Sequence, residues 1–159
     1  MQIQVFSVFD VLGTAHLYAE KTLKKSAKHQ QIKLLIKADE TAILHGDAPK
    51  LALALRHLLS NAIKFTQQGA INIEGKINAD ESITIKISDT GLGIDAAQLD
   101  QLSQPFVQAE QGLDRSSAGT GLGLAIVKRL CLKWGGSLAF ENNSPQGTVV
   151  ILNLPNLGG

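Results

Sequence analysis

The chain has 159 residues, of which 44% are hydrophobic and 18% are charged, and its formal net charge is +1 at pH 7. This composition is typical of a single globular domain, which we place over residues 1–159, and it excludes a disordered chain. Neither nucleic acid nor an anionic membrane is expected as a partner, because the near-neutral charge offers little electrostatic attraction for them.

Cysteine content and hydropathy indicate the cellular compartment in which the domain is expected. The single cysteine, Cys131, excludes a disulfide framework and is typical of a reducing compartment. No apolar stretch approaches the about 20 residues that a membrane-spanning helix needs, and no signal peptide is recognisable. We therefore expect a cytoplasmic domain without direct membrane contact, and any membrane anchor of a parent protein would lie outside this sequence.

The first half of the chain is predicted to form two helices and a strand. Apolar residues recur at helical spacing over about 10–28, and a short strand follows over 31–37. Asp47 precedes an Ala-Pro pair and has the character of a helix N-cap, so a second helix is expected over about 47–65. One stripe of the first helix is basic, as is typical of a solvated face: Lys21, Lys24, Lys25 and Lys28.

Antiparallel strands and one long helix are predicted in the second half. Isoleucines at every second position mark two strands joined by a polar turn. After a short helix that follows Ile94, the polar stretch 103–118 lacks periodicity and is expected to form a lid. A helix over about 122–134 ends at a Gly-Gly pair. The predicted strands are 71–77, 83–87, 137–141 and 148–154. Helices and a mixed sheet in separate layers predict a two-layer α/β sandwich.

Three polar residues share one stripe of the second predicted helix. His57, Asn61 and Lys64 stand at positions i, i+4 and i+7, apart from the apolar stripe. An amide oxygen can ligate a hard divalent cation, and an ammonium group one turn further along can bind phosphate oxygens. Taken alone, such a stripe favours a solvated polar face.

A carboxylate and two glycines follow the second strand of the hairpin. Asp89 at a strand end can accept a hydrogen bond from an exocyclic amine such as that of adenine, and Gly91 and Gly93 let the backbone approach a flat ring. A plain turn is the alternative. Asp-Thr-Gly is also the catalytic triplet of aspartic proteases, but those enzymes use two such aspartates and this chain has one, so that chemistry would need a homodimer.

The glycine-rich segment 119–124 opens the last predicted helix. Its backbone N–H groups and the helix N-terminus favour phosphate. A dinucleotide-binding fingerprint is disfavoured, because that motif follows a strand near the start of a βαβ unit and this segment follows a polar stretch. The order of the features along the chain predicts one site that holds an ion, an adenine ring and phosphates.

Together these motifs resemble the ATP-binding catalytic domain of bacterial sensor histidine kinases, a branch of the GHKL ATPase and kinase superfamily. The resemblance runs from residue 9 to residue 155, and the lid, with Arg115 four residues before Gly119, is most similar to that of hybrid sensor kinases. The segments that resemble the family's asparagine box, first glycine box, phenylalanine box and second glycine box are 58–66, 89–94, 104–109 and 119–124.

The resemblance implies the Bergerat ATP-binding fold, in which three main helices lie on a mixed sheet of about five strands beneath an ATP lid. It also implies ATP and Mg²⁺ as ligands. Asn61 would ligate Mg²⁺, Lys64 and Arg115 would bind phosphates, and Asp89 would accept from the adenine amine. Phe106 would anchor the lid or meet partner helices. The other residues that it assigns to the nucleotide are Phe65, Gly91, Gly93, Ile94, Gly119, Thr120, Gly121, Leu122, Gly123 and Leu124.

The sequence departs from this family at two points. The position four before Asn61 is commonly another asparagine in sensor kinases, but here it is His57, whose imidazole can orient or deprotonate a water near the metal. No helical hairpin carrying a phosphoacceptor is expected, because none of the remaining histidines is followed by the acidic residue usual in that motif. These are His16, His29 and His45.

We therefore expect a protein-histidine kinase fragment that donates the γ-phosphate of ATP to a histidine on a separate dimerisation hairpin, from which it passes to a response-regulator receiver domain. A nucleotide-binding regulator of the same fold without kinase activity is the alternative, and the intact motifs argue against it. An anti-sigma serine kinase is a third reading, which the phenylalanine box and the segment 64–66 disfavour.

Overall fold

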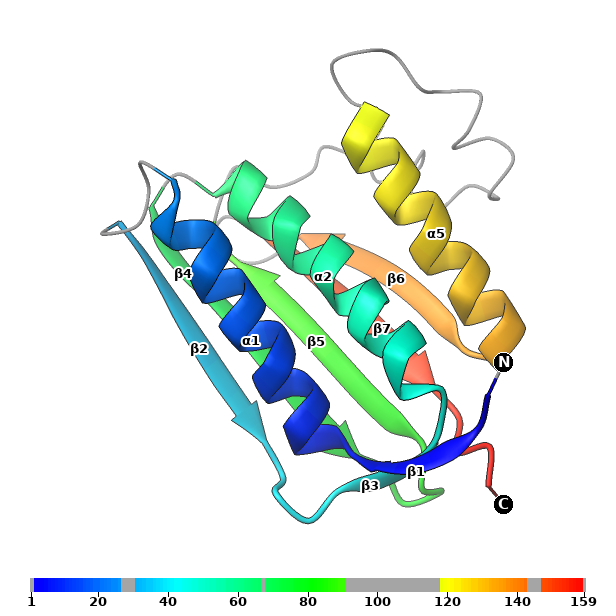
Figure 1. Ribbon diagram of the computed structural model, residues 1–159. Coiled ribbons are helices and arrows are strands. Elements are labelled where there is room, and N and C mark those ends of the chain that lie inside the picture. The colour runs from blue at the N-terminus through cyan, green and yellow to red at the C-terminus, as the bar shows by residue number, and fades with distance from the viewer. Residues whose placement is uncertain (1, 27–30, 67, 91–117, 143–146, 159) are drawn as a thin grey trace.

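A computed structural model of the chain describes residues 2–26, 31–66, 68–90, 118–142 and 147–158. In this part of the chain, three helices lie on one face of a five-stranded sheet (Figure 1). The helices are α1 (Val8–Lys24), α2 (Ala48–Phe65) and α5 (Ala118–Trp134). The strands of this sheet are β2 (Ile32–Ala38), β4 (Gly69–Ile77), β5 (Ile83–Asp89), β6 (Ser137–Asn142) and β7 (Thr148–Leu154). The predicted two-layer α/β sandwich is confirmed.

The sheet is mixed, with the strand order β2-β4-β5-β7-β6. Strands β2 and β4 pair in parallel, whereas β4, β5, β7 and β6 pair antiparallel with their neighbours. The register places Asp89, the last residue of β5, between Ile71 of β4 and Thr148 of β7. Because β5 is the central strand, the carboxylate at its end is flanked by backbone on both sides.

Helix α1 begins earlier than the apolar period predicts. Ser7 is its N-cap and accepts a hydrogen bond from the backbone N–H of Asp10, and the helix starts at Val8 instead of residue 10. Asp10 in the first turn and Lys24 in the last complement the helix dipole. Every apolar residue that the helical period singles out within α1 is buried: Leu12, Ala15, Ala19 and Leu23.

Helix α2 confirms its predicted cap. The Asp47 side chain accepts from the backbone N–H of Lys50, and a proline occupies the first turn, where no intrahelical donor is required. At the other end the backbone N–H of Thr66 donates to the carbonyl of Ala62, and the chain then turns away into β4. The helix therefore runs along the sheet from the Asp47 end to the Thr66 end (Figure 1).

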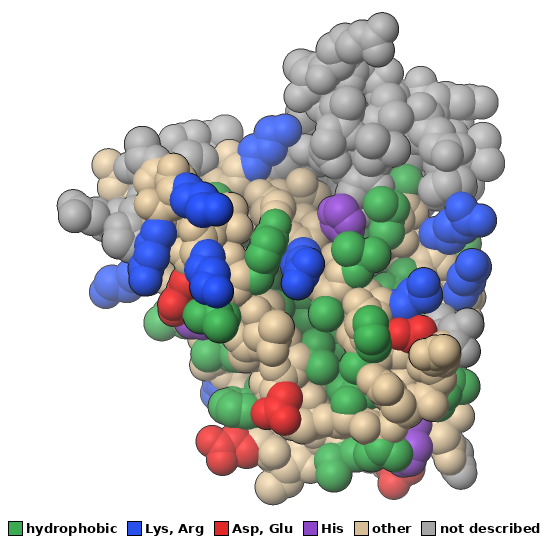
Figure 2. Space-filling model, in the orientation of Figure 1, with side chains coloured by type: hydrophobic (Ala, Val, Ile, Leu, Met, Phe, Trp, Pro, Cys, Tyr) green, Lys and Arg blue, Asp and Glu red, His purple; other side chains and the backbone are tan. Residues whose placement is uncertain are grey.

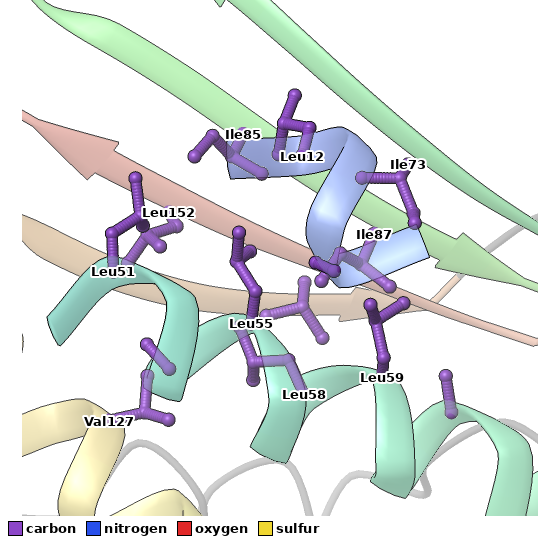
Figure 3. Close-up of a cluster of buried hydrophobic side chains, with 14 of the residues drawn as sticks. Leu12, Leu51, Leu55, Leu58, Leu59, Ile73, Ile85, Ile87, Val127 and Leu152 are labelled. Carbon is purple, nitrogen blue, oxygen red and sulfur yellow. The ribbon is translucent and has the colours of Figure 1, made fainter. Parts of the chain in front are cut away.

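The core lies between the helices and the inward face of the central strands (Figure 3). Leucines of α2 point from the helix toward isoleucines that alternate along β4 and β5, as the sequence pattern predicts. Full burial of one such side chain contributes about 1.5–3 kcal/mol, so this layer supplies much of the stability of the domain. Its fully buried members include Leu51, Leu55, Leu58, Leu59, Ile71, Ile73, Ile83, Ile85 and Ile87.

A separate two-stranded ribbon was not expected from the sequence. Strand β1 (Gln4–Ser7) pairs antiparallel with β3 (Ile43–Gly46), and the backbone N–H of Val8 donates to the carbonyl of Ala42. The two strands have four residues each and are joined through α1 and β2. Such short strands carry too little periodicity to be recognised, and β1 runs directly into a helix.

Both ends of the described chain lie on the side of the domain that carries this ribbon (Figure 1). The backbone N–H of Gln2 donates to Asp47 Oδ2, and that of Leu157 donates to the His45 carbonyl. Trp134 at the end of α5 donates its indole N–H to the carbonyl of Pro155 at 2.9 Å. The end of α2, the end of β5 and the start of α5 lie at the opposite end of the domain, which is thereby left clear of both termini. Among the described residues, no helix has the length and apolarity needed to cross a membrane.

Candidate nucleotide-binding site

Asp89 is a buried carboxylate at the end of the central strand. Its side chain is 5% exposed, and Oδ1 accepts a hydrogen bond from the backbone N–H of Thr148 at 3.3 Å. Aspartate is rarely buried unless it is paired or hydrogen-bonded, because removing a charge from water is costly. The strand end therefore holds a desolvated hydrogen-bond acceptor in a fixed position, as adenine recognition requires.

Close backbone packing holds this strand end in place. Ala70 and Thr90 exchange two hydrogen bonds, one from the Thr90 N–H to the Ala70 carbonyl and one from the Ala70 N–H to Thr90 Oγ1. Gly147 has a φ of +116°, and a Cβ atom at that position would meet the carbonyl oxygen of Asp89. Only glycine allows the β7 side to approach Asp89 this closely.

The predicted polar stripe of α2 lies apart from the buried stripe. His57 and Asn61 are partly exposed and Lys64 is exposed. By contrast, Leu55 and Leu58 of the same helix are buried in the core. Asn61 and Lys64 belong to the last two turns of α2, at the same end of the domain as Asp89 (Figure 1). The fold thus brings the amide, the ammonium and the buried carboxylate to one end.

Partial burial lowers the pKa of His57 below its ordinary value of 6.5, because desolvation disfavours the imidazolium form. The imidazole is therefore neutral at pH 7. A neutral ring has one nitrogen able to accept a hydrogen bond, which is the state that an interaction with a water molecule near a metal would need.

The glycine-rich segment lies within α5 and not before it. Helix α5 begins at Ala118, four residues earlier than predicted, so residues 119–124 form its first turns. The first four backbone N–H groups of a helix have no intrahelical acceptor and favour an anion. Of the predicted segment, Gly119, Thr120 and Gly121 fall within these first four positions, at the same end of the domain as Asp89, whereas Leu122, Gly123 and Leu124 lie one turn further, where the N–H groups of an α-helix bond within the helix (Figure 1).

Several predicted site residues lie outside the described part of the chain. Of the predicted lid over 103–118, only Ala118 lies within the described residues. The backbone of Phe65 is described, but its side chain is not. The other predicted residues outside the described ranges are Gly91, Gly93, Ile94, Phe106 and Arg115.

Basic side chains surround the end of the domain that carries Asp89. Lys21, Lys24 and Lys25 are exposed at the end of α1, as is Lys64 at the end of α2. In the face shown in Figure 2, blue side chains gather over these helix ends, and acidic ones lie mostly toward the opposite end. This distribution favours the approach of an anionic ligand to the end that holds Asp89, even though the net charge is near zero.

Two buried polar residues at this end were not assigned a role from the sequence. Thr148 is 7% exposed and its backbone N–H supports Asp89, a relation that follows from the register of β5 with β7 and leaves no signal in the sequence. Thr66 is fully buried, and its hydroxyl Oγ1 has no hydrogen-bond partner. An unpaired buried hydroxyl costs about 1–3 kcal/mol of folding free energy, so Thr66 destabilises the domain relative to a threonine whose hydroxyl is hydrogen-bonded.

The described donor set suits Mg²⁺ bound together with phosphates. Within the described residues, no group of three or more histidine, cysteine or acidic side chains could hold a metal by itself. Mg²⁺ does not need such a cage, because it usually keeps several waters and binds through one or two protein oxygens plus substrate phosphates. Asn61 offers one such oxygen.

Comparison with known proteins agrees with this geometry. The family described as histidine kinase-, DNA gyrase B-, and HSP90-like ATPase matches residues 46–157. Among relatives, the autoinducer 2 sensor kinase/phosphatase LuxQ of Vibrio parahaemolyticus is 33% identical over 98% of this chain and 18% of that protein. Hybrid signal transduction histidine kinase B of Dictyostelium discoideum is 32% identical over 94% of this chain and 8% of that protein. The sensor histidine kinase RcsC of Salmonella typhimurium is 37% identical over 77% of this chain and 13% of that protein.

Solved structures show the same fold. The catalytic domain of histidine kinase ThkA superimposes with a TM-score of 0.80 at 19% identity, over 98% of both chains. The mycobacterial sensor histidine kinase MprB gives a TM-score of 0.75 at 24% identity, over 97% of both chains. The predicted arrangement of three helices on a five-stranded mixed sheet is thereby confirmed. The chain spans less than a fifth of the length of the relatives named above. It belongs to the histidine kinase-, DNA gyrase B- and HSP90-like ATPase family and has the fold of histidine kinase catalytic domains.

Proposed function

We propose that this chain binds Mg·ATP and donates the γ-phosphate to a histidine on a separate dimerisation hairpin of its parent kinase. A receiver domain would then take the phosphoryl group onto an aspartate. The observation that carries this proposal is the buried Asp89 at the end of β5, held by Thr148 at the end of the domain where α2 ends and α5 begins. We expect the domain to work in the cytoplasm, where ATP is available.

Asp89 would select the base. In its ionised form a carboxylate is an acceptor only, so it would fit the exocyclic amine of adenine and disfavour the carbonyl oxygen that guanine carries at the same position. Burial strengthens this discrimination, because a mismatched polar pair would remain desolvated. Gly91, Gly93 and Ile94, which follow Asp89 in the chain, would line the ring, and Phe65 would pack beside it.

Residues of α2 and α5 would hold the triphosphate. Asn61 would ligate Mg²⁺, which neutralises charge on the phosphates, and Lys64 would bind a phosphate oxygen. The free N–H groups in the first turn of α5 would bind further phosphate oxygens. Arg115 would reach the γ-phosphate, where charge develops during transfer.

His57 would orient or deprotonate a water molecule near the metal ion. Its lowered pKa keeps the ring neutral at pH 7, so the free nitrogen can accept a hydrogen bond from a water molecule that would occupy the space near Asn61. If the role is correct, His57→Ala changes phosphotransfer or ATP hydrolysis while ATP still binds. Unchanged rates of both reactions would dismiss it.

The test of the proposed function supplies the missing acceptor. The chain is incubated with γ-labelled ATP, Mg²⁺ and a separately purified dimerisation hairpin from one of the sensor kinases to which it is similar. Label on the hairpin that is lost with Asp89→Asn, and absent when the acceptor histidine is changed to alanine, supports a kinase. Tight ATP binding without any labelling of several such hairpins would instead support the alternative, a nucleotide-binding regulator without kinase activity.

A further inference from the structure

Strand β2 forms one edge of the five-stranded sheet, and in the described part of the chain it pairs only with β4 (Figure 1). The backbone N–H of Gly69 in β4 donates to the carbonyl of Gln31, just before β2. Successive residues of a strand direct their backbone groups to opposite sides, so those of Ile32, Leu34 and Ile36 point away from β4. A row of this kind at a sheet edge is a template for a further strand.

A contact with α1 agrees with this direction. The carbonyl of Leu34 accepts a hydrogen bond from Nε2 of His16 at 3.3 Å, so it is turned toward a helix side chain on the open side of the strand. A carbonyl oxygen has two lone pairs, and this contact leaves one of them for an added strand. The strand itself is held in place, because Ile32 is buried and Ile36 packs against the core.

The alternate residues of β2 lie on the sheet face opposite the helices and form a basic-apolar-basic row. Lys33, Leu35 and Lys37 are all exposed, and the side chain of Leu35 is 50% exposed. Among the described residues, neither lysine takes part in an ion pair. The register partner of Leu35 on β4 is the polar Asn72, so β4 offers no apolar cover for Leu35.

An open depression of about 570 Å³ lies at the start of this row. Lys33 and its register partner Ala70 both contribute to its wall, which places the depression where β2 begins. Lys33 is the one charged residue of the wall, and the side-chain amides there add further hydrogen-bond donors, so the depression suits a carboxylate better than an ammonium group. The lining residues are Gln31, Lys33, Gln68, Gly69, Ala70 and Thr90.

A second copy of this chain does not suit the edge. Two β2 strands that paired antiparallel about Leu35 would place Lys33 of one copy opposite Lys37 of the other. Like charges directly opposite each other on neighbouring strands are destabilising, and exposed lysines are typical of edges that avoid self-pairing. A strand with acidic residues at these two positions would replace the repulsion with attraction.

We propose that the outer edge of β2 binds an extended segment of a partner polypeptide by strand addition. The segment has an acidic residue beside Lys33, an apolar residue beside Leu35 and an acidic residue beside Lys37. In this mode of recognition main-chain hydrogen bonds supply affinity and alternate side chains supply specificity. The carboxylate beside Lys33 enters the depression. This interaction goes beyond the proposed kinase function and does not require ATP.

The test uses a capped seven-residue peptide, which matches the length of β2, with glutamate, valine and glutamate at alternate positions and threonine elsewhere. Its affinity for the full 159-residue chain is measured by calorimetry. The peptide should bind at least about tenfold more tightly than the same peptide with lysine in place of glutamate. The double substitution Lys33→Glu with Lys37→Glu should reverse this preference.

Two controls separate strand addition from a general attraction between charges. Lys50→Glu with Lys133→Glu makes the same change in net charge at two exposed lysines of α2 and α5, and it should keep the wild-type preference. The second control uses two acidic peptides that are methylated at alternate backbone nitrogens. Because an added strand directs only every second N–H group to β2, one of these peptides should lose binding to the wild-type chain and the other should keep it.

The proposal is overturned if the wild-type chain does not distinguish the acidic peptide from the basic one, or if both double variants lose the preference equally. Equal binding of the two methylated peptides would also overturn it. A wild-type dimer in sedimentation experiments that Lys33→Glu with Lys37→Glu dissociates would assign the edge to a second copy of the chain, against the proposal.

Discussion

The backbone N–H of Thr148 donates to Oδ1 of Asp89 at 3.3 Å, and the two residues are register partners on adjacent strands β7 and β5. The first residue of one strand thus fixes the side chain of the last residue of the other. Gly147 immediately before Thr148 lies against the Asp89 carbonyl. The orientation of the buried carboxylate is therefore set by the last strand of the domain, 59 residues further along the chain.

Gly147→Ala is predicted to damage both stability and nucleotide binding. The φ of +116° strains an alanine, and its Cβ would displace the backbone of Asp89, so unfolding should become easier by about 1–3 kcal/mol and ATP affinity should fall at least tenfold. The matched control is Gly135→Ala, where φ is +84° but a Cβ would lie 3.8 Å from the nearest atom, on Pro155. That variant should lose stability and keep its affinity. Equal loss of affinity in both variants would count against a specific effect on Asp89.

Asn61→Ala is predicted to remove the dependence of nucleotide binding on Mg²⁺. The wild type should bind an ATP analogue more tightly with Mg²⁺ than without it, and the variant should show little such gain, because its cation ligand is gone. Asn72→Ala is the control, since Asn72 lies on β4 between the inward-facing Ile71 and Ile73 and so faces away from the helices. Calorimetric titrations in Mg²⁺ and in EDTA measure the effect. An undiminished gain in Asn61→Ala would exclude the residue as a metal ligand.

His57 is predicted to make stability fall as the solution is acidified. Its pKa is lowered in the folded state by desolvation, whereas in the unfolded chain it stays near 6.5. The unfolded state therefore binds more protons below pH 6.5, and stability that is fully present above that value is lost as pH falls through the lowered pKa. Urea unfolding between pH 7.5 and pH 5 should show a shallower decline for His57→Gln than for the wild type. The other histidines are present in both proteins, so their contributions cancel in the difference between the two free energies of unfolding. Parallel plots of unfolding free energy against pH would refute the prediction.

Cys131 is predicted to be unreactive in the folded protein. The side chain is 3% exposed, and burial raises the pKa of its thiol to about 11. The thiolate is the reacting species, so at pH 8 modification by a disulfide reagent should be at least about a hundredfold slower than for an exposed cysteine. In guanidinium chloride one thiol per chain should react at once, because the sequence has one cysteine. Rapid labelling of the native protein would show that α5 opens or that the thiol is accessible.

Much of the fold could be predicted from the sequence because its signals are local. Asp47 before an Ala-Pro pair identified the start of α2, and alternating isoleucines identified β4 and β5. The start of α1 was misplaced because its cap is Ser7, which looks like part of a preceding apolar run and not a boundary. The β1–β3 ribbon was missed because each strand is four residues long and its partner lies far away in sequence.

The site was predictable to the extent that its residues form motifs. Asn61, Lys64 and Asp89 were assigned from position within a helix or strand, and the structure places them at one end of the domain. Thr148 carries no such signal, because a threonine at a strand start is ordinary, and Thr66 closes the asparagine-box segment 58–66 without being given a role by it. Their relevance follows from burial and from register, which are properties of the folded chain.

The most direct test of the central claim is the affinity of the chain for a non-hydrolysable ATP analogue in Mg²⁺, measured by calorimetry for the wild type and for Asp89→Asn. Asparagine keeps the size of the side chain and removes the charge, so the variant should fold normally. We predict binding by the wild type and a loss of at least tenfold in Asp89→Asn, with a melting temperature close to the wild-type value. Equal affinity of the two proteins, or no binding by the wild type, would contradict the assignment of this strand end as the adenine site.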